Sequence, residues 1–203
     1  IQPWLQNDGP EPEQEYRASN EAMIHLTGVM NCIMCGACVS DCTVLEVDKN
    51  FLGPAALAKA YRFVADPRDD KNYSRLGRYN QYGGIWDCTR CMECVQVCPK
   101  GVAPMDRIMT LREKAVEAGY WKSYGARHAL VFEDLIERGG TLDEKWLPLR
   151  TWGLLNLPRL FSFSSVGLRA GYKMKMPPIV HHPPPGMENI RRIFEKVRQL
   201  QEK

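Results

Sequence analysis

The sequence has no long apolar run and no strong charge of either sign. No stretch approaches the roughly 20 apolar residues that a membrane-spanning helix needs, so the chain is not expected to be a membrane anchor. The net charge of +3 is too small to indicate nucleic-acid binding. A Gly-rich phosphate loop, a nucleophile elbow, a catalytic carboxylate pair and a signal peptide are all missing. What remains is a chain of 203 residues, enough for one domain or two small ones, without an evident active site.

Alternation of apolar and polar residues at period two is also missing, which predicts an all-α fold with little or no sheet. Helical patterns are clear in several places. Pro54 opens a helix that Asp66-Pro67 ends, and Pro104 opens another that ends at Gly119. Two more helices are predicted over residues 122–138 and from about Met187 onward, residues 16–30 are helix-permissive, and residues 68–84 read as a polar connection.

Three regions are expected along the chain. Residues 1–15 contain Pro3, Pro10 and Pro12 and predict an extended arm. Residues 16–120 form the main helical domain, and residues 121–203 form a helical C-terminal extension for subunit docking. The first residue, Ile1, is not an initiator methionine, so we expect processing or truncation upstream of it.

The extension carries an apolar segment, a proline-rich strap and a final helix. Residues 141–176 are apolar enough to form either a small satellite core or a docking face for a partner subunit or a membrane surface; the large apolar residues are Trp146, Leu149, Trp152, Leu154, Leu155, Leu157, Leu160, Phe161 and Phe163. Five of the ten residues from Met176 to Pro185 are prolines, which predicts a stiff strap. The final helix has an apolar stripe suited to packing or to a groove on a neighbour. The pair His181-His182 suits surface or packing roles better than a metal site.

All eight cysteines of the chain lie in one motif that occurs twice. Each copy has the spacing C-x2-C-x2-C-x3-C, and Pro99 follows the second copy; the copies are Cys32, Cys35, Cys38 and Cys42, then Cys88, Cys91, Cys94 and Cys98. This is the run that binds two [4Fe-4S] clusters in bacterial ferredoxins, where the fourth cysteine of each copy ligates the other cluster. The pattern assigns Cys32, Cys35, Cys38 and Cys98 to cluster 1. It assigns Cys42, Cys88, Cys91 and Cys94 to cluster 2.

Other uses of eight cysteines fit less well. A zinc ribbon uses two pairs per site and gives no reason for the third and fourth cysteines of each copy. Disulfides would suit a small secreted scaffold, which this chain does not resemble, and inert thiols would not fall at cluster spacing twice. Between ligands, Gly36 and Ala37 keep side chains small where amides approach sulfur. Positive charge at Arg90 and Lys100 would raise a cluster's potential, or these two side chains are simply solvated.

Beyond the cysteines, the chain resembles the iron–sulfur subunit of succinate dehydrogenase and fumarate reductase. The resemblance lies in the segment from Phe51 to Asp70, in Cys98 to Pro104, and in Ile1 to Gln6, which is similar to the linker after that family's [2Fe-2S] domain. It covers roughly residues 1–118 and implies an alpha-helical ferredoxin domain. It further implies a non-catalytic electron-transfer subunit, peripheral on the cytoplasmic (or matrix) side of the membrane, between a flavoprotein with FAD and a membrane anchor that reduces quinone.

Three departures from that family stand out. No C-x4-C-x2-C run is present, so the [2Fe-2S] domain lies upstream or on another chain. Cys91 stands where the usual member lacks a cysteine and builds a [3Fe-4S] cluster, which implies a [4Fe-4S] cluster here. The family's quinone-site Trp loop and His are replaced by Val44 to Val47 and by Thr89, which questions the usual quinone pocket.

Residues 120–203 resemble the C subunit of heterodisulfide reductases in length and pattern. Atypical succinate dehydrogenases combine both traits and are thought to pass electrons to a cysteine-rich, heterodisulfide-reductase-like subunit. The sequence therefore predicts an electron-transfer subunit of an atypical succinate dehydrogenase or fumarate reductase. The alternative is the C subunit of a heterodisulfide-reductase-like complex.

Overall fold

The structure is a computed structural model that describes residues 4–153, 156–176 and 181–201, and these residues contain helices and connections but no strand. The all-α prediction is confirmed. The chain divides into two compact units, Ile1–Ser123 and Tyr124–Lys203, and each is described by itself. Ile1 to Pro3 of the predicted arm, Leu154 and Leu155 of the apolar segment, and Pro177 to Val180 of the proline strap lie outside the described residues.

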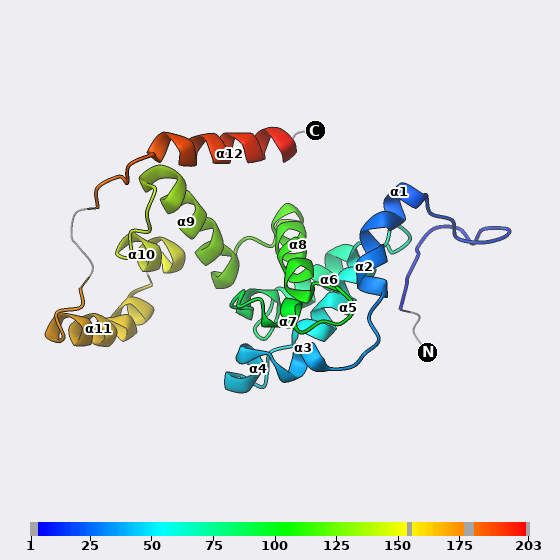
Figure 1. Ribbon diagram of the computed structural model, residues 1–203, viewed down its shortest axis with the longest axis horizontal. Coiled ribbons are helices and arrows are strands. Elements are labelled where there is room, and N and C mark those ends of the chain that lie inside the picture. Colours follow the sequence, from blue (N-terminus) through cyan, green and yellow to red (C-terminus); the bar gives the residue numbers. More distant parts are fainter. Residues whose placement is uncertain (1–3, 154–155, 177–180, 202–203) are drawn as a thin grey trace. The chain divides into compact units, whose positions relative to one another are not determined.

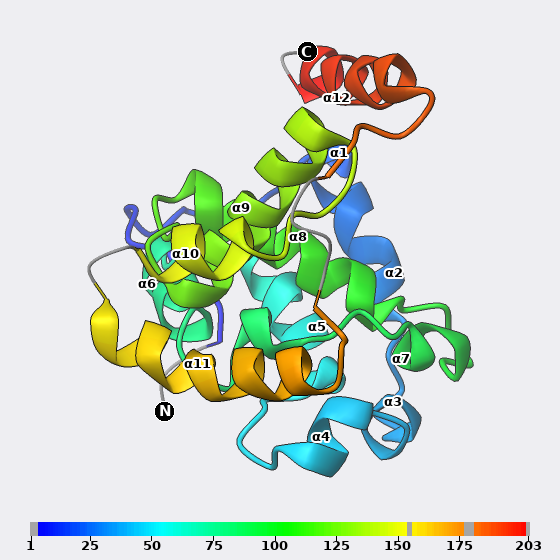
Figure 2. The same cartoon turned by 90° about the vertical axis from the view of Figure 1, so that its left-hand side faces the viewer.

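The first unit contains two longer helices, α5 and α8, with short helices around them (Figure 1). Its elements are α1 Asn20–Met23, η1 Ile24–Leu26, α2 Thr27–Met30, α3 Ala37–Ser40, α4 Thr43–Val47, α5 Pro54–Val64, α6 Asn72–Tyr79, η2 Ile85–Asp87, α7 Glu93–Gln96 and α8 Pro104–Glu117. Short helices α3, α4 and α7 gather near one end of the α5–α8 pair (Figure 2). The cysteine motifs are therefore held at the end of a packed helical core.

Helices α5 and α8 pack against each other and supply most of this core. Leu57 and Tyr61 of α5 and Ile108 and Leu111 of α8 are all buried. Each such side chain contributes about 1.5–3 kcal/mol relative to exposure. Both helices begin as predicted, at a proline in the first turn. Proline suits that position because its missing N–H would have no partner in the helix.

Helix α6 lies in the segment that the sequence analysis treated as a polar connection. Its buried apolar contact is Leu76, while the rest of the helix is largely polar. Gly77 lets the Tyr120 side chain approach closely, and the Tyr120 hydroxyl donates to the backbone oxygen of Tyr73 over 3.1 Å. The helix was missed because one buried leucine makes too weak a periodic pattern, and its packing partner comes from a distant segment.

After α5, two buried aspartates are paired with arginines, and one of them also ties the chain to the arm near its start. The Asp66 carboxylate is fully buried and accepts two hydrogen bonds from the Arg68 guanidinium, at 2.8 and 2.7 Å. Asp69 is paired with Arg75 at 2.8 Å and also accepts from the backbone N–H of Gln6. These hydrogen bonds give the arm, predicted as extended, a defined attachment to the first unit.

The Asp66–Arg68 pair predicts a pH-dependent contribution to stability. Hydrogen bonding from Arg68 lowers the pKa of Asp66 below its ordinary value of 3.8, against an opposing effect of burial. A folded-state pKa below the unfolded value stabilises the folded protein above about pH 4, and this contribution is lost as the pH falls through the lowered pKa. We expect Asp66→Asn to cost about 2 kcal/mol at pH 7, and the difference from wild type to shrink below about pH 3. Denaturant unfolding across this range measures it.

Glu117→Gln serves as the control for that series, because Glu117 is exposed and has no ion pair with any residue that the structure describes. It should change the free energy of unfolding by less than about 0.5 kcal/mol at every pH. A constant Asp66→Asn deficit from pH 7 down to pH 2 would show that the ionised carboxylate is not the stabilising form.

Gly83 marks a close backbone contact between the two motif-bearing halves of the first unit. Its backbone oxygen accepts a hydrogen bond from the N–H of Leu52 over 2.7 Å, and its φ is +80°. A Cβ added at Gly83 would lie 2.4 Å from the backbone oxygen of Asn50. The segment that leads into the second motif can therefore pass this close to residues 50–52 only with glycine here.

Gly83→Ala is expected to destabilise the protein by about 2–5 kcal/mol, since it combines a left-handed φ with a backbone clash. Gly119→Ala is the matched control, because Gly119 has a φ of +90° and no atom within 4 Å of an added Cβ. That control isolates the conformational cost, about 1 kcal/mol. Thermal or urea unfolding of both variants measures the difference, and equal losses would refute the close-contact explanation.

The second unit consists of α9 Tyr124–Gly139, α10 Trp146–Trp152, α11 Leu157–Tyr172 and α12 Met187–Gln201. Helix α9 packs on α10 and α12, and α11 packs on α10. Ion pairs support these contacts, with Arg150 on Asp134 and Arg198 on Glu137. Among the described residues of this unit, only Ala126 and Thr151 are buried. No helix in the described part of the chain is long and apolar enough to cross a bilayer.

The apolar segment of residues 141–176 divides into two parts. In α10, Leu149 and Trp152 are partly buried, as expected for a small satellite core. In α11, Leu157 and Phe161 are 69% and 81% exposed, as expected for a docking face. The side chains of Leu160 and Phe163 lie outside what the structure describes. His181 is held by Glu144 and Asp143, at 3.1 and 3.5 Å, which agrees with the packing role preferred for it.

Candidate iron–sulfur centres

The two cysteine motifs follow the same backbone path. In each copy, the residues just before and just after the second cysteine have positive φ: Met34 and Gly36 in the first, Arg90 and Met92 in the second. Each of these turns leads into a short helix that carries the third cysteine, α3 or α7. Such left-handed turns orient successive backbone N–H groups into concavities that bind anions, including iron–sulfur clusters. Three non-glycine residues here bear a conformational cost that is typical of functional sites.

Cys32, Cys35, Cys38 and Cys98 come together at one cavity, which we call site 1. The cavity encloses about 250 Å³. Its other walls come from Ala55 and Ala58 of α5 and from the segment that follows Cys98. Although 60 residues separate Cys38 from Cys98, their thiols are close enough for Cys98 to affect the pKa of Cys38. Site 1 is thus assembled from both copies of the motif.

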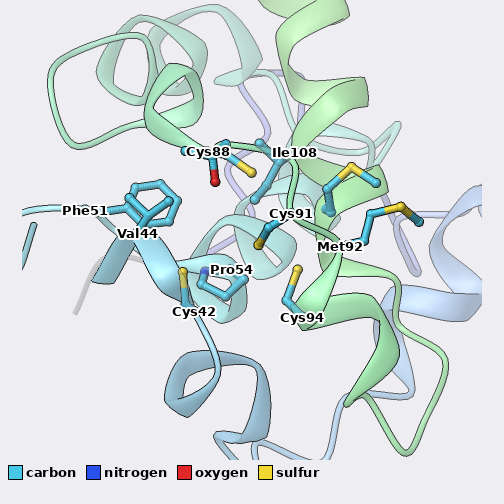
Figure 3. Close-up of a pocket in the computed structure, with 11 residues that line it drawn as sticks. Cys42, Val44, Phe51, Pro54, Cys88, Cys91, Met92, Cys94 and Ile108 are labelled. Atoms are coloured by element: carbon cyan, nitrogen blue, oxygen red, sulfur yellow. The ribbon is translucent and has the colours of Figure 1, made fainter. Parts of the chain in front are cut away.

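Cys42, Cys88, Cys91 and Cys94 line a second cavity, site 2, whose thiols turn toward a common space in Figure 3. Its enclosed volume is about 10 Å³, smaller than that of site 1. Phe51, Pro54 and Ile108 add apolar walls. The structure therefore sorts the eight cysteines into the two groups of four that the crossed assignment names.

Burial and hydrogen bonding act in opposite directions on these thiols. Burial raises the pKa of Cys94 to about 11 and also raises that of Cys88 and Cys38. Cys91 is exposed, and the hydroxyl of Thr43, followed by the backbone N–H of Glu93, lowers its pKa. Because iron binds thiolates, occupation of these sites must displace protons, most easily at Cys91.

The starts of the two long helices lie at these cavities. Pro54 lines site 2 while Ala55 lines site 1, and Pro104 lines site 1 while Met105 lines site 2. The backbone N–H of Met105, in the first turn of α8, opposes the rise of the Cys94 pKa. Free N–H groups and the positive end of the helix dipole favour an anion at such a position. Both sites are therefore electrostatically suited to negatively charged groups.

Two further donors to sulfur were missed by the sequence analysis. The Thr43 hydroxyl donates to the Cys91 sulfur over 3.6 Å, and the N–H of Val102 donates to the Cys98 sulfur over 3.4 Å. Thr43 directly follows Cys42, and the crossed assignment puts Cys42 and Cys91 at the same site. A role for Thr43 could therefore have been inferred from the crossed assignment of the cysteines.

Arg112 is a buried cation next to site 2. It is 8% exposed, and its guanidinium donates to the backbone oxygens of Ile85 and Cys88 over 2.8 and 2.7 Å. It also lies 5.2 Å from the ring centre of Trp86. Burial lowers its pKa to about 10, so it stays charged at neutral pH. Arg112 lies among the buried apolar residues of α8. A charged residue at such a position is a signal in the sequence by which Arg112 could have been found.

Arg90 and Lys100, the two cations considered beside the ligands, are both exposed. Lys100 lines site 1. Arg90 contributes a left-handed backbone conformation to the turn of the second motif. Val44 and Thr89 stand at positions where the family that the chain resembles has quinone-site residues. Both side chains line site 2. These side chains contribute apolar and hydroxyl groups there, with no imidazole or indole.

The residues present fit iron–sulfur clusters. Each site offers four thiols, largely apolar walls, and N–H or O–H donors directed at sulfur, which is the environment that holds and tunes such clusters. In the described residues, no group of three His, Cys, Asp or Glu side chains is arranged to hold a single metal ion. The thiolates that hold a four-iron cluster lie farther apart than the ligands of a single metal ion, because the cluster is larger than one ion.

Comparison with known proteins gives the same chemistry. Residues 28–102 match the family described as "4Fe-4S dicluster domain". The succinate dehydrogenase iron–sulfur subunit of Coxiella burnetii is 36% identical over 119 residues, which are 58% of this chain and 50% of that protein. The corresponding subunit of Paracoccus denitrificans is 34% identical over 118 residues, 58% and 46% of the two chains.

A third relative is the 8-methylmenaquinol:fumarate reductase iron–sulfur subunit of Wolinella succinogenes, 33% identical over 131 residues, 64% of this chain and 41% of that protein. The chain thus spans about half the length of the curated relatives that it matches. Residues 28–102, which match the 4Fe-4S dicluster domain, lie within a part of the chain that is similar to the iron–sulfur subunits of succinate dehydrogenase and fumarate reductase.

Proposed function

We propose that this chain is the electron-transfer iron–sulfur subunit of a succinate dehydrogenase or fumarate reductase complex. The observation that carries the proposal is the gathering of eight cysteines into two four-thiol sites, in a region similar to such subunits. Cluster 1 would be held at site 1 and cluster 2 at site 2, by the ligands named from the sequence. Bound there, two [4Fe-4S] clusters would supply one-electron transfer.

The arrangement of the two sites supports a relay. Helices α3 and α7, which carry Cys38 and Cys94, are in contact, and Cys38 affects the pKa of Cys94 across the boundary between the sites. The first turns of α5 and α8 contribute to both sites, so one pair of packed helices lines both cavities. Such a pair keeps two redox centres at a constant separation without needing any movement of the chain.

The chain carries no substrate chemistry in this proposal. Electrons would come from a flavoprotein with FAD through a [2Fe-2S] domain, upstream or on another chain. They would leave for a membrane-anchor or cysteine-rich, heterodisulfide-reductase-like subunit. The absence of imidazole and indole at Thr89 and Val44 supports a receiver other than the usual quinone pocket.

The decisive experiment adds succinate to the anaerobically purified, oxidised complex and follows cluster reduction by electron paramagnetic resonance. Succinate should reduce the chain's clusters and malonate, a competitive dicarboxylate, should prevent it. Clusters that respond to a dithiol or heterodisulfide couple but stay oxidised with succinate would favour the heterodisulfide-reductase-like alternative. About eight irons per chain are expected, and stoichiometric zinc with almost no iron would refute the cluster assignment.

Cys91 provides a separate prediction. If all four thiols of site 2 ligate iron, gently oxidised wild-type protein should show no [3Fe-4S] resonance. Cys91→Ser should create one, because it removes the most exposed ligand of the site, the one to which the Thr43 hydroxyl donates. Thr43→Val is the control, since it removes that hydrogen bond and keeps all four thiols. A strong [3Fe-4S] resonance in the wild type would overturn the four-thiol assignment.

A further inference from the structure

Helix α11 of the second unit has a row of exposed apolar side chains along one side. Leu157, Phe161, Leu168 and Tyr172 follow one another at intervals of four, seven and four residues, so at 3.6 residues per turn they share one face. Their exposed fractions are 69%, 81%, 74% and 91%. Large apolar side chains concentrated on one face normally mark a binding surface.

The charge around this face has a single sign. From Lys145 to Met176 the sequence has six Lys or Arg residues and no Asp or Glu. Three of the six cations are engaged within the unit: Lys145 pairs with Asp143, Arg150 pairs with Asp134, and Arg159 stacks on Tyr124. Arg169 lies within α11, and Lys173 and Lys175 follow its end beside the exposed Met174. The surface therefore combines apolar side chains with a local excess of positive charge.

We infer that α11 binds in the plane of an anionic lipid surface, with its Leu157–Tyr172 face in the outer acyl region and its flanking cations at the headgroups. In-plane helices of this kind pair bulky apolar residues on one side with Lys or Arg that attract anionic lipid. Tyrosine at the end of the face suits the boundary between acyl chains and headgroups. The helix is 16 residues long and is not apolar enough to span a bilayer.

Helix α12 offers an internal comparison. It too has exposed apolar side chains, with Ile193 and Leu200 each 62% exposed. However, its sequence includes Glu188 and Glu195 among its basic residues, and Arg198 is already paired with Glu137 of α9. Helix α12 thus has exposed apolar side chains but charges of both signs. This combination favours contact with protein rather than with anionic lipid. The lipid proposal thus depends on the combination found only at α11 among the described helices of this unit.

The test uses flotation of the full chain, purified in its complex with clusters in place, with vesicles of phosphatidylcholine alone or with one third phosphatidylglycerol. The wild type should bind the anionic vesicles, and high salt should weaken binding. Phe161→Ser with Leu168→Ser should reduce the partition coefficient by at least tenfold. Ile193→Ser with Leu200→Ser, the matched change on α12, should reduce it less than twofold. Lys173→Gln with Lys175→Gln should remove the preference for phosphatidylglycerol.

Iron content and far-ultraviolet circular dichroism show whether each variant keeps its fold and clusters, independently of vesicle binding. Equal losses for the α11 and α12 variants, or binding of the wild type that is indifferent to phosphatidylglycerol, would contradict the proposal. So would a wild-type chain that binds no vesicles while the α11 variant loses a co-purifying protein subunit, since a protein would then cover the face. None of these readouts uses electron transfer, so the result stands apart from the proposed function.

Discussion

Replacing Cys42 with serine is expected to remove the cluster at site 2 and to leave the cluster at site 1. Cys42 belongs by sequence to the first motif, but in the structure it lines the cavity of Cys88, Cys91 and Cys94. Iron should fall from about eight to about four per chain, and the remaining spectrum should match that of Cys88→Ser rather than that of Cys38→Ser. Anaerobic reconstitution followed by iron and sulfide analysis, with electron paramagnetic resonance of the reduced protein, makes the comparison.

The same substitution should also lower stability. A cluster at site 2 ties Cys42 to Cys88, 46 residues apart in the sequence, and therefore restricts the unfolded chain as a cross-link does. By the loop-closure relation for cross-links, the loss is about 4 kcal/mol. Anaerobic urea unfolding measures it. The control is Cys98→Ser, which removes the corresponding crossed ligand of site 1 and should leave the spectrum of site 2.

If Cys42→Ser instead removed the spectrum shared with Cys32, Cys35 and Cys38, each motif would bind its own cluster. The grouping of thiols around the two cavities would then have to differ from the one in the structure. Loss of both clusters with a retained helical fold would also contradict the independence of the two sites.

Replacing Arg112 with methionine should destabilise the first unit by about 2–5 kcal/mol. The guanidinium is the donor to the backbone oxygens of Ile85 and Cys88, and a buried acceptor left without its partner costs about 1–3 kcal/mol. Methionine keeps most of the buried volume and so limits the effect of an empty cavity. Lys114→Met, which removes a cation from the same helix where no hydrogen bond to site 2 is made, should cost less than about 1 kcal/mol.

Arg112→Met should also make the cluster at site 2 harder to reduce, because a buried positive charge beside Cys88 favours the more negative, reduced state. The reduction potential of site 2 should fall while that of site 1 stays nearly constant, in a redox titration followed by electron paramagnetic resonance. Arg112→Lys should recover most of the potential but less of the stability, since an ammonium cannot reach both oxygens with the geometry of a guanidinium. Equal shifts at both sites would indicate a general loosening of the fold.

Much of the first unit could be predicted from local sequence. Pro54 and Pro104 determine where α5 and α8 begin, because proline in the first turn needs no intrahelical partner for its nitrogen. The eight cysteines and their spacing determine the candidate ligands and their crossed grouping. These features depend on residues close together in the chain, or on a spacing that permits few other uses.

The structure decided what depends on distant segments. Helix α6 is held by Leu76 and Tyr120, the buried cation is Arg112 rather than Arg90, and Thr43 meets Cys91 only because the two motifs face each other. The exposed face of α11 likewise could not be told from a satellite core by its apolar residues alone. Sequence spacing determined which atoms could bind iron, while burial and long-range contacts decided which charges and donors surround them, because those depend on where the chain returns in space.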